Sequence, residues 1–512
     1  MFKYNYERRV SHPVKVGDIV IGGDNPIVIQ SMTNTSTLDT EGSAAQALRI
    51  AAAGGELVRL TTQGVREAAN LAPIKEIIRG EGSALPLSAD VHFNPKAAFE
   101  AARTADKVRI NPGNFVDAAR TFRSLEFTDE EYAAEIARIR ASFVPFLKLC
   151  RENNTAVRLG VNHGSLSDRI MSRYGDTPAG MVESVMEFLR IAEEEKFKDI
   201  IISIKASNTV VMVETVRLLV KEMEKAGMDF PLHLGVTEAG DAEDGRIKSA
   251  VGIGALLHEG IGDTIRVSLS EPPENEIPVA RLLRQHVGQR AAAPEVEEPN
   301  DPVSVSQREI ADPSLEYRDF EIDNPVMIGQ LAADIDKFVA SGHKNPVRLI
   351  INYNCTDLDE LRVRAGADFG ALLLSGYGSD IKVKDPNFDE ATLSRLASDI
   401  LQAARLKFYK TEYIACPGCG RTLFDLQSAL AEVKKEVGKL GIEGLKIGVM
   451  GCIVNGPGEM ADADYGYVGA GPGRVSIYRG KQLITKNIPT AEALPALIEL
   501  IKSDSGNRRH DI

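Results

Sequence analysis

The 512-residue sequence predicts an α/β protein that consists of an N-terminal TIM (β/α)8 barrel, a small α/β insert and a C-terminal α/β domain. Three observations predict this order. Eight short β-rich runs alternate with longer helical stretches between residues 27 and 270, which fits the roughly 250 residues of a (β/α)8 barrel. A segment rich in Pro and Ala then interrupts the pattern, and three of the five cysteines follow in the last part of the chain.

The eight β-rich runs are expected to be the parallel strands of the barrel. Strands that alternate with helices form βαβ units, and eight such units close into a barrel. A doubly wound open sheet is the alternative, but nearly every run ends in an unusual polar residue, where barrel enzymes assemble their sites. A hairpin-like segment at 12–23 is expected to cap the lower end of the barrel. The runs lie at 27–32, 57–60, 85–91, 107–110, 156–161, 200–205, 232–236 and 264–269.

The chain changes character after the barrel. Residues 288–307 are rich in Pro, Ala and acidic side chains, which is typical of a linker. The stretch 276–407 has 132 residues, about half of what a second barrel needs, so we expect a small α/β spacer. Its predicted elements are strands at 347–354 and 370–376 and helices near 358–366 and 390–406.

The last part of the chain is expected to form a compact α/β domain. Its predicted elements are a helix at 423–439, a strand at 445–451, glycine-rich turns at 466–473, a strand at 474–478 and a helix at 490–503. The predicted domain limits are therefore 1–275 for the barrel, 276–407 for the insert and 408–512 for the C-terminal domain.

The composition excludes several classes of protein. Hydrophobic residues make up 43% of the chain and charged residues 26%, as in a folded globular protein. The formal net charge of -13 does not favour nucleic acid or an anionic membrane surface, so an anionic ligand needs a local group of cations. The sequence has neither an apolar run long enough for a membrane helix nor the apolar core of a signal peptide at its start, so we expect a cytoplasmic bacterial protein.

Polar residues at the predicted strand ends indicate what the barrel binds. Arginine or lysine occurs on five different strands, and closure of the barrel brings these cations to one rim. Any one of them could be a structural ion-pair residue, but five converging cations favour a phosphate or diphosphate, whose oxygens match the guanidinium fork. The strand-end residues are Arg59, Arg109, Asn111, Asn114, Arg158, Asn162, Lys205, Ser207, His233, Glu238, Arg266 and Ser268.

The segment around the seventh strand allows two interpretations. Thr237 and Glu238 lie just beyond this strand. Among cations, Glu238 either anchors an arginine or transfers a proton to a leaving oxygen. His233 either donates to phosphate or is a buried histidine of the barrel.

The clustered cysteines indicate metal or redox chemistry. Cys416 and Cys419 form a C-x-x-C pair, and Cys452 follows after 32 intervening residues. A redox dithiol is expected near the first helix of a small βαβ domain, and zinc needs a fourth ligand although His510 is the only histidine of this domain. A cubane iron-sulfur cluster with three thiolates needs one more ligand, and Glu459 follows Cys452 by seven residues beyond the turn NGPG. An iron-sulfur domain with one exchangeable iron is therefore predicted.

Eight segments of the chain together match a known family. They are QSMTNT (30–35), RINPGN (109–114), RLGVNHGSLSDRI (158–170), SIKASN (203–208), PLHLGVTEAG (231–240), EGIGDTIRVSL (259–269), CPGCGRTLFDLQ (416–427) and GCIVNGPGEMADADYGYVG (451–469). In this order they resemble the family of 4-hydroxy-3-methylbut-2-enyl diphosphate synthases of the methylerythritol phosphate route to isoprenoids. NHGSLSDRI, CGRTLFDLQ and GEMADADYGYVG resemble its longer, three-domain members.

The resemblance implies a reaction, a cofactor and site residues. Members of the family open 2-C-methyl-D-erythritol 2,4-cyclodiphosphate by a two-electron reductive dehydration that uses a 4Fe-4S cluster, with flavodoxin or ferredoxin as electron donor. By motif, Cys416, Cys419, Cys452 and Glu459 are the cluster ligands, and Glu238 is the catalytic acid or base. The implied substrate-binding residues are Arg59, Arg109, Asn111, Asn114, Arg158, Asn162, Lys205, Ser207, His233, Thr237, Arg266, Ser268 and Asn455.

The insert departs from this family pattern. In long members the extra domain resembles another barrel, whereas here only the segment 350–383 resembles its final strands. We expect a homo-oligomer, and the sequence leaves open whether the cluster serves the barrel of its own chain or that of a partner. Cys355 in the insert and Cys150 in the barrel are expected to be buried thiols without a ligand role.

Two other functions fit part of the pattern. One is a non-catalytic protein with structural zinc whose barrel only binds a phosphorylated ligand. The other is a pterin-type phosphate barrel transferase whose C-terminal domain is a redox sensor. The iron or zinc content of the protein separates both from the reductive dehydratase.

Overall fold

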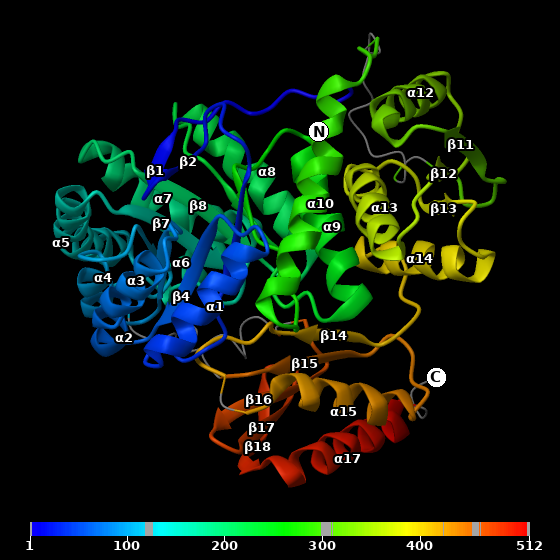
Figure 1. Cartoon of the computed structure of the whole chain (residues 1–512). Coiled ribbons are helices and arrows are strands. Elements are labelled where there is room, and N and C mark those ends of the chain that lie inside the picture. The colour runs from blue at the N-terminus through cyan, green and yellow to red at the C-terminus, as the bar shows by residue number, and fades with distance from the viewer. Residues whose placement is uncertain are drawn as a thin grey trace.

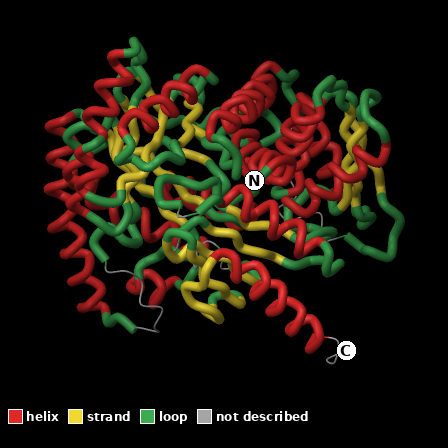
Figure 2. The backbone as a smooth tube through the Cα atoms, turned by 60° about the horizontal axis from the view of Figure 1, so that its bottom comes forward, coloured by secondary structure: helices red, strands yellow, loops and turns green. Residues whose placement is uncertain are grey.

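The computed structural model describes residues 3–508 except 118–125, 298–308, 310, 423, 453–459 and 461. Figure 1 shows the blue-to-green barrel, the yellow-green insert at its side and the orange-to-red C-terminal domain below both. Figure 2 shows the strands of the barrel and the small sheet of the insert as separate groups. The predicted fold class, a TIM barrel with a small α/β insert and a C-terminal α/β domain, is confirmed.

The barrel consists of eight parallel strands in the order β8-β7-β6-β5-β4-β3-β10-β9. It closes between β8 and β9 through a single bridge from Ile202 to Leu232. Every residue of the eight strands is buried, as expected for parallel strands that are covered on both faces. The strands are β3 (Val28–Met32), β4 (Leu57–Thr62), β5 (Leu87–Val91), β6 (Lys107–Ile110), β7 (Ala156–Asn162), β8 (Ile200–Lys205), β9 (His233–Leu234) and β10 (Thr264–Ile265).

A short hairpin covers the end of the barrel where its strands begin. The antiparallel strands β1 (Val14–Val16) and β2 (Ile19–Ile21) form it. Their buried side chains pack against residues near the starts of the barrel strands, including Val28 and Leu57. The predicted cap at the lower end is therefore confirmed.

Helices cover the outside of the barrel. Helix α10 packs into the barrel core through Ile277, Leu283 and Val287, although it lies beyond the predicted limit at residue 275; the domain limits themselves stay a prediction. Within the described ranges, no helix is both long and apolar enough to cross a bilayer. The barrel helices are α1 (Thr40–Ala52), α2 (Val65–Ala69), α3 (Leu71–Gly80), α4 (Pro95–Ala101), α5 (Asp129–Asn153), α6 (Asp168–Tyr174), α7 (Pro178–Glu194), α8 (Thr209–Lys225), α9 (Ala242–His258) and α10 (Glu276–Gly288).

The described part of the insert from Arg318 to Ala403 forms a three-stranded parallel sheet with three α-helices. The predicted strand at 347–354 is confirmed as β12. The predicted strand at 370–376 is wrong, because this run contains the buried end of helix α13 and the turn that follows it. A short apolar run without a clear period does not separate a buried strand from a buried helix. The elements are β11 (Arg318–Ile322), α12 (Ile328–Ala340), β12 (Val347–Asn352), α13 (Leu358–Leu373), β13 (Asp380–Lys384) and α14 (Glu390–Ala403).

Helix α13 of the insert packs directly against helix α9 of the barrel. A Cβ atom at Gly370 would lie 2.7 Å from the Cα and 2.8 Å from the oxygen of Val251. A Cβ atom at Gly254 would lie 2.6 Å from the Cβ of Ala367. The glycines therefore permit a backbone-to-backbone contact that no larger residue allows.

A buried polar cluster also joins the insert to the barrel. His286 Nε2 lies 2.8 Å and His258 Nε2 3.1 Å from Asp368 Oδ1, and the Tyr353 hydroxyl donates to the other carboxylate oxygen at 3.1 Å. Burial would raise the pKa of Asp368, but the two histidines outweigh burial and hold this pKa at about 2. The carboxylate stays charged and links the insert to the C-terminal ends of α9 and α10.

The C-terminal domain contains a mixed five-stranded sheet. Its first three strands are parallel and its last three antiparallel. The glycine-rich turns predicted at 466–473 are wrong, since most of this segment is strand β16, whose glycines permit close contacts: a Cβ at Gly469 would lie 2.3 Å from the Gly451 oxygen. The elements are β14 (Glu412–Ala415), α15 (Leu426–Gly438), β15 (Lys446–Met450), β16 (Tyr465–Gly471), β17 (Arg474–Arg479), β18 (Gln482–Pro489) and α17 (Thr490–Arg508).

The contact between α13 and α9 gives a first prediction. Gly370→Ala should lower the free energy of unfolding by about 1–3 kcal/mol, because the added methyl group has to displace the backbone of Val251. Gly288→Ala is the matched control, since a Cβ there meets nothing within 4 Å and alanine favours a helix. Denaturant unfolding followed by circular dichroism measures both; equal midpoints for the two variants would contradict the close contact.

Candidate active site

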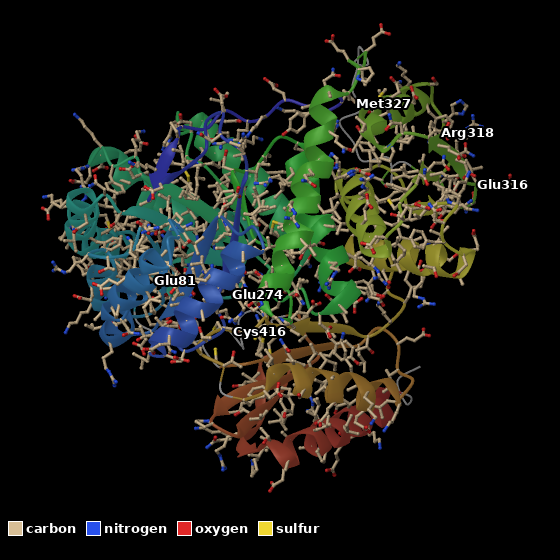
Figure 3. All side chains as sticks on the ribbon, in the orientation of Figure 1. Glu81, Glu274, Glu316, Arg318, Met327 and Cys416 are labelled. Carbon is tan, nitrogen blue, oxygen red and sulfur yellow. The ribbon has the colours of Figure 1, made fainter. Side chains whose placement is uncertain are left out.

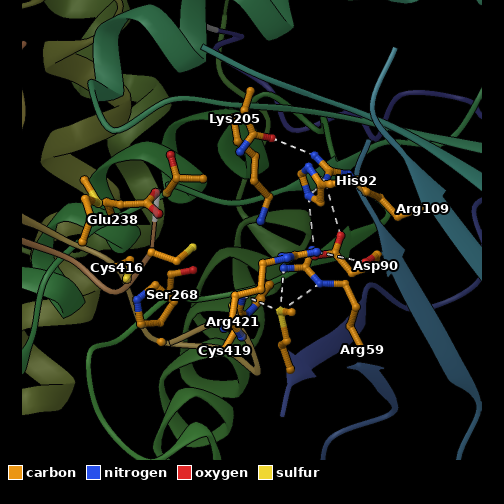
Figure 4. A pocket seen from close by; sticks show the side chains of 18 of the residues that line it. Arg59, Asp90, His92, Arg109, Lys205, Glu238, Ser268, Cys416, Cys419 and Arg421 are labelled. Atoms are coloured by element: carbon orange, nitrogen blue, oxygen red, sulfur yellow. Dashed lines mark hydrogen bonds and ion pairs between the residues drawn. The ribbon is translucent and has the colours of Figure 1, made fainter. Parts of the chain in front are cut away.

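A cavity lies where the mouth of the barrel meets the C-terminal domain. Its volume is about 90 Å³, and its walls come from barrel strand ends and from the segments that carry Cys416 and Cys452. Figure 3 places Cys416 between the two domains, and Figure 4 shows the side chains that line the cavity. The location fits the rule that barrel enzymes build their sites at the carboxyl ends of the strands.

Most of the predicted site residues line this one cavity. The barrel contributes the five predicted cations together with polar groups from β7, the loop after β9 and the segment after β10, and the C-terminal domain contributes thiols. The predicted residues that line the cavity are Arg59, Arg109, Arg158, Asn162, Lys205, Thr237, Glu238, Arg266, Ser268, Cys416, Cys419 and Cys452.

Four other predicted residues do not line the cavity. Asn111 shapes the loop after β6, where its side-chain oxygen accepts a hydrogen bond from the Gly113 N–H at 3.0 Å. The side-chain oxygen of Asn114 accepts from the Phe93 N–H at 3.4 Å, and Ser207 is buried after β8. These three residues are placed to support the loops around the site.

His233 is the fourth of these residues and is fully enclosed in β9. Its Nδ1 lies 3.4 Å from the Thr264 hydroxyl. Burial lowers the pKa of His233 well below its ordinary value, and Arg158 and Lys205 lower it further, so the ring is neutral. The predictions for Asn455 and Glu459 lie outside the described residues.

Two of the five cations are paired with buried carboxylates. Arg109 donates to Asp90 Oδ1 at 3.2 Å. Arg266 donates to both oxygens of Glu276, at 3.0 and 2.8 Å. Burial would raise the pKa of Asp90, but Arg59 and Arg109 outweigh burial and hold this pKa well below its usual range. The Asp90 carboxylate therefore stays charged.

The other three cations form no ion pair with any carboxylate in the described part of the chain. Among the described residues, Arg59 donates only to the Met32 sulfur, at 2.9 and 3.1 Å, and Arg158 has no hydrogen-bond partner for its Nε and Nη1. Burial lowers the pKa of Arg59 to about 10 and that of Arg158 and Lys205 well below their ordinary values. Buried cations without partners are costly, so the site is built for an anion.

Two glycines make room for these long side chains inside the barrel. A Cβ atom at Gly160 would lie 2.5 Å from the Nε of Arg109, and one at Gly235 would lie 2.8 Å from the Nζ of Lys205. A larger residue at either position would displace a cation from the mouth.

Glu238 faces the cavity from a strained backbone. Its φ angle is +49°, an uncommon conformation for a residue other than glycine. The side chain is 5% exposed, and its Oε2 has no hydrogen-bond partner among the described residues. No described arginine or lysine lies within ion-pair distance of it, so the anchoring role considered from the sequence has no support in the described contacts.

The three clustered thiols fit a metal cluster. Cys416 Sγ accepts the Gly451 N–H at 3.2 Å, and Cys419 Sγ accepts the Arg421 N–H at 3.5 Å. Burial raises the pKa of Cys416 well above its ordinary value, and the carboxylate of Glu238 raises it further. Thiolates in such a place need a bound cation, and the backbone N–H donors are oriented to stabilise thiolate sulfur.

The thiols and the barrel that form this cavity belong to the same chain. Ala415 forms a parallel bridge with Ala239, directly after Glu238. The Ser270 hydroxyl, located after β10, donates to the Cys416 carbonyl oxygen at 2.9 Å. Within one chain, the C-terminal domain therefore lies on the chain's own barrel.

Several residues of the cavity were not predicted from the sequence. Asp90 stands in the last part of β5, so the strand-end rule that found the arginines could have found it too. His92 follows β5 directly; burial and Arg109 lower its pKa to about 3, so the neutral ring accepts a hydrogen bond from Arg109. Arg421 belongs to the CPGCGR segment, but no local pattern shows that it reaches the barrel. The other missed residues are Met32, Pro417, Gly418 and Met450.

Comparison with family models matches both end domains. A model described as the GcpE TIM-barrel domain matches residues 11–281, and one described as the GcpE protein C-terminal domain matches residues 412–503. The part of the chain between these two matches contains most of the insert.

Curated relatives match over nearly the whole chain. The 4-hydroxy-3-methylbut-2-en-1-yl diphosphate synthase (flavodoxin) of Bacteroides fragilis is 49% identical over 606 positions that cover 98% of this chain and 96% of the relative. The enzyme of the same name from Phocaeicola vulgatus is 49% identical, with 98% of both chains covered, and that from Leptospira interrogans is 38% identical, again with 98% of both covered. Aligned lengths of 606 and 655 positions exceed the 512 residues of this chain, so these relatives contain segments that it lacks.

The unpaired cations give a prediction for the free protein. Inorganic pyrophosphate should raise its unfolding temperature, and Arg158→Met should remove most of this effect while the unliganded variant is as stable as wild type or more so, because a buried unpaired charge is lost. Arg190→Gln is the control, since Arg190 is exposed and pairs with Glu183 at 2.6 Å. Thermal unfolding with and without pyrophosphate measures this; an unchanged pyrophosphate response of Arg158→Met would contradict the assignment.

Proposed function

The chain belongs to the GcpE family, and we propose that its cavity binds the cyclodiphosphate substrate of this family beside a 4Fe-4S cluster. The reaction is the reductive dehydration and ring opening of 2-C-methyl-D-erythritol 2,4-cyclodiphosphate to 4-hydroxy-3-methylbut-2-enyl diphosphate in the methylerythritol phosphate pathway. The observation that supports the placement is a single cavity lined by five cations of the barrel and three thiols of the C-terminal domain.

The unpaired cations are proposed to bind the diphosphate. Arg59, Arg158 and Lys205 lack carboxylate partners within the described chain, so phosphoryl oxygens would replace the missing counter-charges. Arg109 and Arg266 are already oriented by Asp90 and Glu276 and would add donors without reorganisation. The remaining proposed contacts are Asn162, Thr237 and Ser268, which line the cavity, and Asn111, Asn114, Ser207, His233 and Asn455.

The three thiols and Glu459 are proposed to hold the cluster. Cys416, Cys419 and Cys452 line the cavity and are partly buried, and the N–H donors to Cys416 and Cys419 fit thiolate ligands. When bound, a 4Fe-4S cluster supplies electrons one at a time and a Lewis-acidic iron for the leaving oxygen. A carboxylate as the fourth ligand binds more weakly than thiolate, which would leave that position exchangeable.

Glu238 is the proposed proton donor. Loss of the substrate oxygen as water requires a proton, and a carboxyl group in reach of the departing oxygen provides it. Its buried side chain has one oxygen without a partner among the described residues, and it lines the same cavity as Cys416. It also lies on the backbone segment that pairs with Ala415. The positively charged residues would bind the diphosphate, while Glu238 is left to act on the reacting oxygen.

The remaining assignments concern partners and location. The relatives are named for flavodoxin, and we propose flavodoxin rather than ferredoxin as the electron donor. No disulfide joins the five described cysteines, which supports our proposal of a reducing cytoplasm as the location. A homo-oligomer remains a prediction; the described part of the cavity is built from one chain.

Metal content tests the cofactor assignment. Protein purified without oxygen should contain about four irons per chain, and Cys452→Ser should lose most of this iron. Cys355→Ser is the matched control and should keep it, because Cys355 is buried in the core of the insert and does not line the cavity. Colorimetric iron determination and visible absorbance measure both variants. One zinc per chain without iron would point instead to a structural zinc site.

A second test addresses the acid. Glu238→Gln should keep the iron content, but its turnover of the cyclodiphosphate with dithionite should fall by about 10²–10⁴, the usual range for loss of a general acid. Glu222→Gln, on the outer surface of α8 with Lys225 as its partner, should have wild-type turnover. Wild-type turnover by Glu238→Gln would remove Glu238 from the mechanism.

A further inference from the structure

Arg421 lies on the turn that presents Cys419 to the cavity. The Arg421 N–H donates to Cys419 Sγ at 3.5 Å. Two hydrogen bonds, of 2.8 and 3.0 Å, join Cys419 to Thr422 and close the turn. The Arg421 side chain is 6% exposed, so it is fixed by what it touches inside the protein. The Arg421 backbone and the Cys419 thiol are therefore parts of one hydrogen-bonded turn.

The guanidinium of Arg421 crosses from the C-terminal domain to strand β5 of the barrel. Its Nη1 lies 3.3 Å from Asp90 Oδ2, and its Nη2 donates to the Asp90 carbonyl oxygen at 3.1 Å. The other carboxylate oxygen of Asp90 accepts from Arg109 at 3.2 Å. Figure 4 shows Arg421 beside Arg59 and Asp90. One carboxylate thus holds a cation from each domain.

This contact lies opposite the main attachment of the C-terminal domain. Strand β14 joins the barrel after β9 through the bridge from Ala415 to Ala239, and Glu412 of β14 lies 2.5 Å from Lys248 of α9. Strands β9 and β5 are four places apart in the order of the eight-stranded barrel, which puts them across the mouth from each other. The C-terminal domain is therefore attached at one side of the mouth by β14 and contacts the other side through Arg421.

The turn beside Arg421 rests closely on the barrel. A Cβ atom at Gly420 would lie 2.7 Å from the Thr35 carbonyl oxygen, which belongs to the loop after β3. The Gln63 side chain donates to the Gly420 carbonyl oxygen at 3.4 Å. The cavity is therefore closed on this side by the backbone of the same turn.

Charge makes this contact dependent on what fills the cavity. Arg421 adds a cation to a mouth that already holds an excess, and its charge lowers the pKa of Arg59 in addition to the larger effect of burial. Without a ligand, Asp90 is the carboxylate that compensates Arg421; a bound diphosphate would compensate it together with the other cations. Closure of this side and binding of the anion should therefore favour each other.

We propose that Arg421 is a positioning residue whose ion pair with Asp90 closes the C-terminal domain over a bound diphosphate and thereby sets the distance from the Cys419 turn to the substrate. The proposal rests on the proposed function for the identity of the anion. The contact with Asp90 itself stands on the geometry of the barrel and the turn.

The first experiment measures how well bound pyrophosphate shields the cluster. Iron release to a chelator is followed in anaerobic holoenzyme with and without inorganic pyrophosphate. Pyrophosphate should slow the release several-fold in wild type and have little effect in Arg421→Gln, whose C-terminal domain is not held closed. Lys434→Gln is the matched control, because Lys434 also forms an ion pair with the barrel, to Asp241, but on the side of β9. It should keep the wild-type response.

The second experiment measures turnover of the cyclodiphosphate with dithionite. Arg421→Gln should retain its iron and show a kcat/KM reduced about 10- to 100-fold with a raised KM, and Arg421→Lys should recover part of the loss because it restores the charge without the two-point contact. If Arg421→Gln does not retain iron, Arg421→Lys takes its place in the chelation experiment, with partial shielding expected.

The outcomes separate this proposal from the proposed function. If wild-type protein binds pyrophosphate but does not turn over the cyclodiphosphate, the proposed function is wrong. The role of Arg421 is then still tested by the chelation experiment. Equal shielding by pyrophosphate in wild type and in the Arg421 variant would overturn the role of Arg421, whatever the activity of the wild type.

Discussion

The excess of buried positive charge at the barrel mouth is the constraint on which the rest of the site depends. Arg59, Arg158 and Lys205 are enclosed without carboxylate partners in the described chain, a state that costs free energy in the unliganded protein. Binding of an anion can offset this unfavourable free energy, because the anion accepts hydrogen bonds from several preoriented donors at once. The glycines at 160 and 235 and the carboxylate of Asp90 follow from the same constraint, since they give the cations space and orientation.

The small insert holds the C-terminal domain in position on the barrel, although it is not a second barrel. Helix α13 lies on α9 by direct backbone contact, and α9 also carries Lys248, which binds Glu412 at the start of the C-terminal domain. Arg405, just beyond α14, donates to the same carboxylate at 2.9 Å. Barrel, insert and C-terminal domain thus meet at one buried carboxylate, whose pKa is held at about 2 by Lys248 and Arg405 against the opposing effect of burial. A spacer of this size is therefore sufficient to place the thiols over the barrel of the same chain.

The sequence predicted what is encoded locally and missed what depends on packing between segments. The eight barrel strands and the five cations could be predicted because period, spacing and strand ends are properties of short stretches. The run at 370–376 was predicted as a strand because nothing in it shows that α9 covers it. The glycines of β16 were predicted as turns because the close contact of Gly469 with Gly451, the residue after β15, leaves no local pattern. Asp90 and Arg421 form a pair only across the domain boundary, 331 residues apart, so neither residue alone indicates the contact.

The acid and the first thiol are held in place differently from the Cys419 turn. Glu238 and Cys416 are neighbours of the bridged pair Ala239 and Ala415, so the acid and the first thiol are positioned by one backbone contact at β9. Cys419 and Arg421 lie on the turn that reaches β5 across the mouth. If the C-terminal domain rotated about its attachment at β9, Cys419 and Arg421 would move far more than Glu238 and Cys416. The spacing of acid and thiol would then persist in an open form that admits substrate, and the enclosure of the diphosphate would be completed last.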